Sequence, residues 1–376
     1  MENQPFYRDT WAEVDLDAIR DNVSSFACHV QSGTKVMAVV KANAYGHGAV
    51  EVAKAALEAG ADRLAVALLD EAILLREAGI TAPILVLGWI RPSDADVALQ
   101  YDVALTVFQE NWLKAVLRLG AKGLKLHLEI DTGMSRLGIR DRGEAERVLQ
   151  LFKENADAFT LEGVYTHFAT ADSLDSPIFF RQQEIFRDWL FWIAGQGVKP
   201  SIIHTSNSAA ATRVPFDSYD YIRLGISMYG LKPSEEIETP FELKPAFSLH
   251  SRLVHVKELM PGDTISYGAT YTVKEREWIG TIPIGYADGW IRRLKTAKVL
   301  IDGEYAPIVG RICMDQCMVR LPKQLPIGTK VTLIGKQGNK EITMDDIASQ
   351  LETINYEIPC NITSRVPRIY KKRADV

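Results

Sequence analysis

The sequence predicts an α/β protein: a (β/α)8 TIM-like barrel followed by a C-terminal, mostly antiparallel β domain. Two observations predict the barrel, because short β-branched runs recur at regular intervals and helix-period segments separate them. A third predicts the second domain, since the pattern changes to period-two alternation after about residue 243. We expect the barrel over residues 10–243 and the β domain over 244–376, with residues 1–9 packing against the latter.

Eight apolar runs are the expected barrel strands. They are almost continuously apolar, which is typical of parallel strands buried on both faces. In order they are "KVMAVVK" (35–41), "RLAVALL" (63–69), "PILVLG" (83–88), "DVALTVF" (102–108), "LKLHLEID" (124–131), "LEGVYTHFA" (161–169), "SIIHTS" (201–206) and "YIRLGISMYG" (221–230). A doubly wound open sheet is the alternative, but no GxGxxG motif follows the first strand and eight strands suit closure.

Helical periodicity fills the connections that can be assigned. We expect a leading helix over residues 15–30, and helices over 48–60 and 69–79 with Gly79 as the C-cap of the last. In the β domain the only predicted helix covers 343–352, where Thr343 is the expected N-cap. The rest of that domain shows alternating strands and turn dipeptides.

Composition restricts the class of function. The chain has 376 residues, is 47% hydrophobic and 24% charged, and carries a net charge of −5, which suits a globular protein and gives no basis for binding nucleic acid or an anionic membrane surface. The start "MENQPFYRDT" lacks the basic and apolar regions of a secretion signal. The four cysteines form no CxxC pair. We therefore expect reduced thiols and a cytoplasmic protein.

Polar residues follow five of the expected barrel strands at their C-terminal ends. Barrel enzymes place their chemistry at these ends. The residues are Lys41 and Tyr45, the segment "DTGMSR" (131–136), His167, the segment "TSNS" (205–208), and Arg223 with Gly225 and Ile226. Taken singly, each has an ordinary explanation as a core histidine, a helix cap or a surface charge. Together they predict one shared mouth.

A primary amine and a phosphate corner are both present at this mouth. Lys41 comes at the end of an apolar strand, where an unpaired ammonium would be costly to bury. Ser208 and the Gly225 backbone follow strands seven and eight, the usual phosphate-binding corner of a barrel. This pairing indicates a carbonyl cofactor held by a Schiff base, and pyridoxal 5'-phosphate is the candidate. No metal is expected, because the seven histidines include no HxH or HExxH.

The sequence resembles the bacterial alanine racemases, a family of pyridoxal phosphate enzymes with a barrel-type fold. The motifs in the first domain are "AVVKANAYGHG", "EIDTGMSRLG", "HFATAD", "HTSNSAA" and "IRLGISMYGL". Those in the second are "SYGATY", "IPIGYADGW", "GRICMDQCMV" and "INYEIPCNITSRVPRIY". The resemblance covers nearly the whole chain, and the lysine motif together with "SYGATY" is its most specific part.

The resemblance implies a reaction and an assembly. The reaction is the interconversion of L-alanine and D-alanine by two bases, which supplies D-alanine for cell-wall peptidoglycan. The assembly is a head-to-tail homodimer in which Tyr267, Tyr286, Met314 and Asp315 come from the partner subunit, although the sequence does not separate delivery in cis from delivery in trans. The alternatives are a serine or broader-specificity amino-acid racemase, a pyridoxal-phosphate-dependent decarboxylase and a non-catalytic cofactor carrier.

The resemblance also assigns roles to residues. Lys41 is implied as the Schiff-base lysine and first base, and Tyr267 as the second base with His167 hydrogen-bonded to it. The remaining roles are the phosphate cradle (Tyr45, Ser208, Gly225, Ile226, Tyr356), the pyridine-nitrogen partner (Arg223), the substrate-carboxylate and cofactor-oxygen contact (Arg136), the substrate-carboxylate site (Met314, Asp315) and the entrance (Tyr286). His167 is counted with the catalytic and the cofactor-binding residues, and Arg136 with the catalytic ones.

One position departs from the family pattern. Many family members have a lysine, often carbamylated, where this sequence has Glu129. Glu129 either supplies a permanent carboxylate that orients Arg136 or points to solvent from the end of its strand. Both interpretations remain open at the level of sequence.

Overall fold

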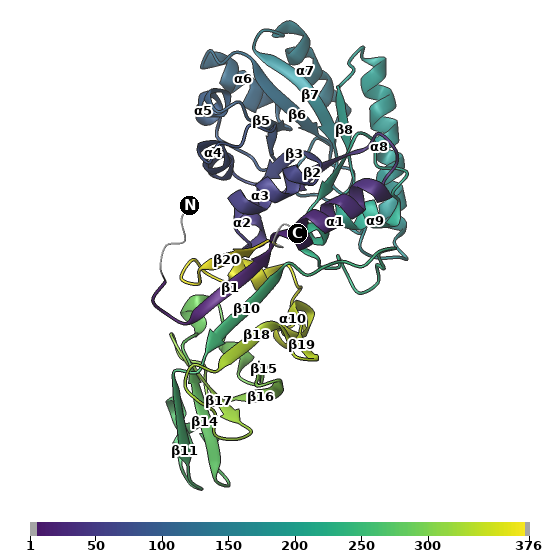
Figure 1. The fold of residues 1–376 in the computed structure, drawn as a ribbon. Coiled ribbons are helices and arrows are strands. Elements are labelled where there is room, and N and C mark those ends of the chain that lie inside the picture. The colour runs from purple at the N-terminus through teal and green to yellow at the C-terminus, as the bar shows by residue number, and fades with distance from the viewer. Residues whose placement is uncertain (1–5, 373–376) are drawn as a thin grey trace. The chain divides into compact units, whose positions relative to one another are not determined.

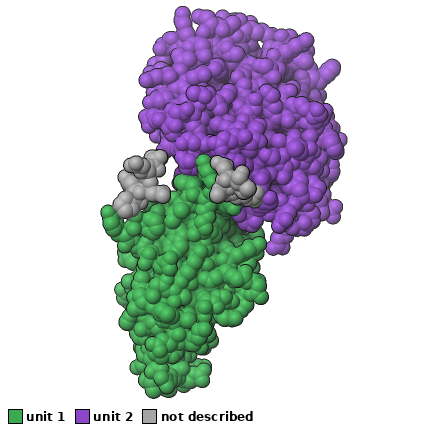
Figure 2. All heavy atoms as spheres, viewed as in Figure 1, with its two compact units in different colours: residues 1–16, 45–48, 246–376 green, residues 17–44, 49–245 purple. Residues whose placement is uncertain are grey.

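The computed structural model describes residues 6–372, which form two compact units. The barrel unit contains residues 17–44 and 49–245, and the β unit contains the described residues up to 16, residues 45–48 and those from 246 onward (Figure 2). No helix among residues 6–372 combines the length and the apolar character needed to cross a bilayer.

Eight parallel strands close the barrel in chain order, as predicted (Figure 1). The pairing of the first and last strands, with Val36 opposite Ile222, completes the closure. The strands are β2 (Lys35–Val39), β3 (Ala61–Val66), β4 (Ile84–Val86), β5 (Ala104–Val107), β6 (Leu124–Glu129), β7 (Phe159–Tyr165), β8 (Ile202–His204) and β9 (Tyr221–Leu224). Most of them end before the apolar runs do, so Lys41 and His167 follow their strands, whereas Arg223 lies within β9.

Helices connect the barrel strands and bury their apolar faces on them. The helix α4 (Leu69–Glu77), for example, buries Leu69, Ala72 and Leu75, and Gly79 follows its C-cap with φ +83°. The others are α1 (Leu16–His29), α3 (Ala49–Glu58), α5 (Ala95–Gln100), α6 (Glu110–Arg118), α7 (Arg142–Glu154), α8 (Pro177–Gly195) and α9 (Ser208–Arg213), with short 3-10 turns η1 (Pro92–Asp94) and η2 (Ile226–Tyr229). The helices predicted over 15–30, 48–60 and 69–79 are confirmed.

The β unit is mostly antiparallel, as predicted. Its main sheet has the order β11-β14-β17-β16-β15-β18-β10-β1-β20, with β19 added to β18 and the hairpin β12-β13 apart. The strands are β1 (Thr10–Asp15), β10 (Phe247–Arg252), β11 (His255–Leu259), β12 (Thr264–Ile265), β13 (Tyr271–Thr272), β14 (Glu277–Ile282), β15 (Lys298–Ile301), β16 (Glu304–Val309), β17 (Cys317–Leu321), β18 (Lys330–Gln337), β19 (Lys340–Ile342) and β20 (Arg368–Lys371). The pair of β1 and β20 is parallel.

The predicted helix of the β unit is present as α10 (Met344–Leu351). Thr343 caps it by accepting the backbone N–H of Asp346 at 3.0 Å, and the Asp346 carboxylate accepts the N–H of Thr343 in return at 2.8 Å. The expectation of a single helix was wrong, because α11 (Glu357–Asn361) and the turns η3 (Tyr267–Ala269), η4 (Tyr286–Asp288) and η5 (Arg292–Leu294) also form. Elements of three to five residues are too short to show a helical period.

The N-terminal boundary of the barrel also differs from the prediction. Residues 10–15 form β1, which pairs antiparallel with β10 and parallel with β20, so they belong to the β unit. In the preceding segment, Arg8 donates to Asp288 at 2.8 Å. Residues 1–5, part of the segment expected to pack there, lie outside the described residues. The period-two pattern of "TWAEVD" marks a strand but does not show which sheet takes it.

Candidate active site

Lys41 lies just after β2, at the first position of a left-handed turn. The strand ends at Val39, so the expectation that Lys41 itself ends the strand was wrong. The next four residues, Ala42 to Tyr45, have φ between +52° and +54°. Left-handed helical conformation costs roughly 1–2 kcal/mol for each residue with a Cβ. Surrounding contacts must therefore hold the turn in place.

Two side chains hold this left-handed turn. The carboxylate of Glu71 accepts the backbone N–H of Ala42 at 2.6 Å and those of Ala67 and Leu68 at 2.8 and 3.1 Å. The side-chain oxygen of Asn43 accepts the N–H of Ala49 at 2.9 Å. These bonds tie the backbone beside Lys41 to the end of β3 and the starts of α3 and α4.

Arg223, on β9, places a buried positive charge inside the barrel. It is 3% exposed, and its two terminal nitrogens reach neutral acceptors only. Nη1 donates to Nδ1 and the carbonyl of His204 at 2.7 and 3.1 Å. Nη2 donates to the carbonyls of Thr166 and Thr205 at 2.8 and 3.0 Å and to Nδ1 of His167 at 3.1 Å. The Nε atom takes part in none of these bonds, so one donor of the guanidinium is left for another partner.

The charges around Arg223 determine which groups are ionised. Burial lowers the pKa of Arg223 to about 10, so the guanidinium stays positive at neutral pH. Burial, together with the positive charges of Arg223, Arg136 and Lys41, holds the pKa of His167 well below its usual range. His167 is therefore neutral. Because its Nδ1 accepts from Arg223, its proton is on Nε2.

Ser208 and the segment after β9 form a corner of backbone donors. The hydroxyl oxygen of Ser208 accepts the N–H of Gly225 at 3.0 Å and that of Ser227 at 3.4 Å. Within residues 6–372, the buried hydroxyls of Ser227 and Thr205 have no hydrogen-bond partner. Ile226 lies between the two donors and is 1% exposed. Converging N–H groups and unpaired hydroxyls suit an anion such as a phosphate.

The loop after β7 is fixed by packing. His167 precedes Phe168, which is buried in a cluster with Phe179, Ala209 and Ala210. These residues belong to α8 and α9, so the same apolar cluster positions the ends of β7 and β8. The barrel thus holds His167, Arg223 and Ser208 on one rigid framework.

Glu129, at the end of β6, is buried rather than pointing to solvent. It is 4% exposed, and its Oε2 has no hydrogen-bond partner in the part of the chain that the structure describes. Burial raises its pKa, although Tyr165, Arg223 and Arg136 act in the opposite direction. Arg136 is exposed, and among residues 6–372 it makes no hydrogen bond or ion pair. The alternative of a solvent-facing Glu129 is therefore wrong.

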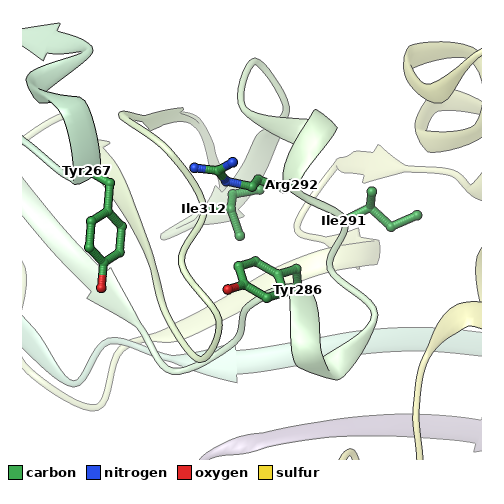
Figure 3. Close-up of a pocket in the computed structure, with 5 residues that line it drawn as sticks. All are labelled: Tyr267, Tyr286, Ile291, Arg292 and Ile312. Carbon is green, nitrogen blue, oxygen red and sulfur yellow. The ribbon is translucent and has the colours of Figure 1, made fainter.

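Tyr267 and Tyr286 line one pocket of about 410 Å³ in the β unit, together with Ile291, Arg292 and Ile312 (Figure 3). Figure 3 shows the hydroxyl of Tyr286 directed toward the side on which Tyr267 lies. The exposed fractions of the two tyrosines are 68% and 42%, so both phenols are accessible.

Buried side chains at both ends hold the loop that carries Tyr267 in place. It joins β12 to β13, and Ile265 and Val273 at its two ends are buried with Ile279 and Val309. Ser266, with φ +67°, donates its hydroxyl to the carbonyl of Arg311 at 2.6 Å. An accessible phenol on a firmly held loop is suited to proton transfer.

The remaining predicted residues of the β unit fall into two places. Met314 is 53% exposed, and the neighbouring Asp315 accepts a bond from Arg365 at 2.7 Å. The rings of Tyr45 and Tyr356 lie 6.2 Å apart between centroids. Burial raises the pKa of Tyr45 and keeps its phenol neutral. The structure thus brings Tyr45 and Tyr356 together. Met314 and Asp315 lie in the loop that precedes β17.

Comparison with known proteins places the chain. Residues 14–233 match the model of the alanine racemase N-terminal domain, and residues 246–370 match that of the alanine racemase C-terminal domain. The alanine racemase of Geobacillus stearothermophilus is 58% identical over 369 residues, covering 97% of this chain and 94% of that protein. The chain belongs to the alanine racemase family.

Solved structures of relatives have the same fold. The alanine racemase of Bacillus anthracis, solved with bound L-Ala-P, is 52% identical with a TM-score of 0.96, covering 98% of this chain and 97% of that one. A histidine racemase from Leuconostoc mesenteroides is 33% identical with a TM-score of 0.91, covering 99% and 100%. One fold therefore accompanies racemases named for different amino acids, so the fold alone does not fix the substrate.

Sequence reasoning about this racemase-family chain missed several residues that hold the site. Glu71 and Asn43 hold the turn beside Lys41, and His204 is a partner of Arg223. Histidines in the apolar runs "LKLHLEID" and "SIIHTS" were the available signal, because a polar residue inside a buried strand needs a partner.

Proposed function

We propose that this chain interconverts L-alanine and D-alanine with pyridoxal 5'-phosphate as cofactor and Lys41 and Tyr267 as the two bases. Family membership over nearly the whole chain supports the reaction. The observation that carries the residue assignment is the buried Arg223, with its charge intact and one donor unused, in the same barrel end as Lys41 and Ser208.

The residues present fit the proposed cofactor. The N–H groups of Gly225 and Ser227 and the unpaired Ser227 hydroxyl suit its phosphate, with Ser208, Ile226, Tyr45 and Tyr356 completing the proposed cradle. The unused Nε–H of Arg223 suits the pyridine nitrogen, and Arg136 the phenolic oxygen. When bound through Lys41, pyridoxal phosphate would hold the substrate amine and withdraw electrons from its α-carbon.

The protein's own part in the reaction is to remove a proton from one face of the α-carbon and to supply another proton to the opposite face. The amine of Lys41 would take or return the α-proton on one side, and the phenol of Tyr267 on the other. An amine can serve as a base only when it is uncharged. A free tyrosine titrates near pH ~10, so Tyr267 needs a donor that stabilises its phenolate. We assign this role to the Nε2–H of His167.

Family membership favours alanine as the substrate. The residues that line the pocket would determine how strictly other amino acids are excluded. Arg136, Met314 and Asp315 are the proposed contacts of the substrate carboxylate, and Tyr286 the proposed entrance. Tyr356 and Met314 would restrict the space to a methyl side chain. A serine or broader-specificity racemase is the second candidate, because apolar pockets reject an added hydroxyl only weakly. The histidine racemase relative makes this alternative concrete.

Incubation with single amino acids tests the reaction. L-alanine, L-serine, L-lysine and L-histidine are supplied separately, and the enantiomers are resolved by chiral chromatography. We expect racemisation of alanine to exceed that of the others. Equal rates for serine would favour the broader racemase, and no racemisation of any of them would refute the proposal. Borohydride reduction followed by peptide mapping should place a pyridoxyl group on Lys41.

We further propose a head-to-tail homodimer in which Tyr267, Tyr286, Met314 and Asp315 serve the barrel of the partner subunit. Mixing Lys41→Ala and Tyr267→Phe subunits tests this. After random exchange, half of the dimers contain one subunit of each variant. Delivery in trans gives each of these mixed dimers one intact site of two, so the mixture should show about a quarter of the wild-type activity. Delivery in cis predicts none. Sedimentation of the wild-type chain gives the oligomeric state independently.

We also propose a cellular role for the product of the reaction. D-alanine is a component of cell-wall peptidoglycan, and its supply is the role we propose. Cys28, Cys313 and Cys317 are free thiols, which supports a reducing cytoplasmic environment.

A further inference from the structure

A chain of hydrogen-bonded side chains runs through the barrel interior from Arg223 to Glu162. Nη1 of Arg223 lies 2.7 Å from Nδ1 of His204, and Nε2 of His204 lies 2.9 Å from Nδ1 of His127. Nε2 of His127 then lies 2.9 Å from Oε2 of Glu162. Both imidazoles are completely buried. The chain thus links the guanidinium of the proposed cofactor site to a carboxylate on β7.

The two ends of the chain fix the direction of every bond in it. A guanidinium can only donate, so Nδ1 of His204 must accept, which puts the proton of His204 on Nε2. That N–H donates to Nδ1 of His127, so the proton of His127 is also on Nε2 and is donated to Glu162. An ionised carboxylate only accepts, and it completes the sequence of donors. Protonating either imidazole would turn two N–H groups toward each other.

The backbone of β6 and β7 leaves room for these hydrogen-bonded side chains. The pairing of β6 with β7 shifts register between Leu126 and His127, so that His127 stands opposite Gly163 and Glu162 is the extra residue of a bulge. A Cβ on Gly163 would lie 2.3 Å from Nδ1 of His127. The glycine therefore leaves the space that the imidazole occupies.

Glu162 is itself held at the far end of the chain. Arg63 on β3 donates to its two oxygens at 3.1 Å each, and also to the hydroxyl of Tyr221 at 3.3 Å. Tyr221 in turn donates to Asp62. This arginine fork keeps the carboxylate ionised and stationary, because a bidentate pair fixes both charge and orientation.

We propose that Glu162, acting through His127 and His204, is a positioning group that holds the guanidinium of Arg223 for the cofactor. The inference rests on the proposed function only in what Arg223 does, not in how it is held. Neither Glu162 nor His127 touches the reacting atoms. Their effect is to keep Nδ1 of His204 a hydrogen-bond acceptor, so that Arg223 remains the positively charged member of the hydrogen-bonded chain.

Neutron diffraction of crystals of the purified full-length protein tests the direction of the chain. We expect deuterium on Nε2 of His204 and of His127 and none on Nδ1 of either. Deuterium on Nδ1 of either residue would overturn the proposal. This result does not depend on the substrate or on turnover, so it can fail while the proposed function stands, and the reverse also holds.

A pair of substitutions tests the function of the chain. In His127→Gln the amide keeps an acceptor for His204 and a donor for Glu162, whereas His127→Leu keeps the volume and removes both. For His127→Leu we expect turnover to fall about tenfold and the Kd for pyridoxal phosphate to rise about tenfold, which corresponds to one charge-assisted hydrogen bond. The KM for alanine should change less than twofold. His127→Gln should restore most of both losses.

A matched control is Glu110→Gln. It removes a carboxylate that pairs with Lys114 and Arg147 on surface helices, away from the hydrogen-bonded side chains of the barrel interior. It should leave turnover and cofactor affinity unchanged, and circular dichroism should show all three variants folded. Wild-type turnover and affinity in a folded His127→Leu variant would refute the positioning role. Equal losses in the two His127 variants would do the same, because they would show that only the shape of the imidazole matters.

Discussion

Nη2 of Arg223 lies 3.1 Å from Nδ1 of His167, and this contact makes His167 a neutral hydrogen-bond donor. A histidine in an active site is commonly taken for an acid or a base. Here the guanidinium occupies the Nδ1 lone pair, and the surrounding positive charge holds the pKa of His167 well below its usual range. His167 can therefore stabilise an anion with its Nε2–H but is not available to accept a proton from a phenol.

Tyr267→Phe should abolish racemisation while the cofactor stays bound. The phenolic hydroxyl is the only group lost, and it belongs to a loop whose ends are fixed by buried side chains. We expect turnover at least 100-fold below wild type, the usual scale for loss of a general base. The visible absorption of the purified protein should be unchanged. Tyr305→Phe, at a tyrosine of the β unit that is 44% exposed, is the control and should keep wild-type turnover. Wild-type rates in Tyr267→Phe would remove it from the mechanism.

Glu129→Gln should separate function from stability. Burial raises the folded pKa of Glu129, so the folded state binds more protons than the unfolded state and this group makes stability fall as pH rises past about 4.5. Removing the charge should raise Tm at pH 7 and leave Tm unchanged near pH 4. If the carboxylate orients Arg136, the KM for alanine should rise about tenfold. An unchanged KM together with a raised Tm would leave Glu129 without an orienting role.

Much of the barrel could be predicted because its signals are local. Apolar runs such as "KVMAVV" and helical segments such as 69–79 show the periodicity of a strand or a helix within a few residues. Eight strand–helix pairs in succession then predict a closed barrel. The order also predicts that Lys41 and His167 lie at one end of the barrel, although both follow their strands rather than end them. Their roles came from the resemblance to a family, because no local pattern distinguishes a catalytic lysine from a surface one.

The rest depends on contacts between distant segments. Four successive left-handed residues after Lys41 could not be predicted, since nothing in "KANAY" shows that Glu71 will hold the turn. The assignment of β1 to the β unit likewise depends on β10 and β20, which come more than 200 residues later. Propensity describes what a segment tolerates, and tertiary contacts decide what it adopts.

His250 should make the protein lose stability in mild acid. This residue of β10 is buried against Thr332 and Ser248, and the charged side chains that face it are Glu13, Lys330 and Lys371. Burial, with the two lysines, lowers its pKa to about 4. The unfolded state therefore binds a proton near pH 6.5 that the folded state rejects, so stability is complete above about pH 6.5 and falls between pH 6.5 and 4.

The change from this group should be about 2 kcal/mol between pH 7.5 and pH 5. Urea unfolding at a series of pH values measures it. His250→Gln should flatten the curve by that amount, whereas His255→Gln, at an exposed position on β11, should leave it unchanged. Identical curves for His250→Gln and the wild type would show that another group causes the acid sensitivity.

Gly163→Ala should damage both stability and the interior hydrogen-bond chain. The new methyl would lie 2.3 Å from Nδ1 of His127, which is held on both sides by His204 and Glu162. Overpacking of this kind costs about 1–3 kcal/mol. Gly195→Ala is the matched control, because a Cβ there meets no atom within 4 Å and the site is the last residue of α8. That substitution should be neutral or stabilise by about 0.5–1 kcal/mol. Urea unfolding of both variants at pH 7 compares them, and a Gly163→Ala variant as stable as Gly195→Ala would show that His127 can move, which would contradict the rigid chain inferred from the structure.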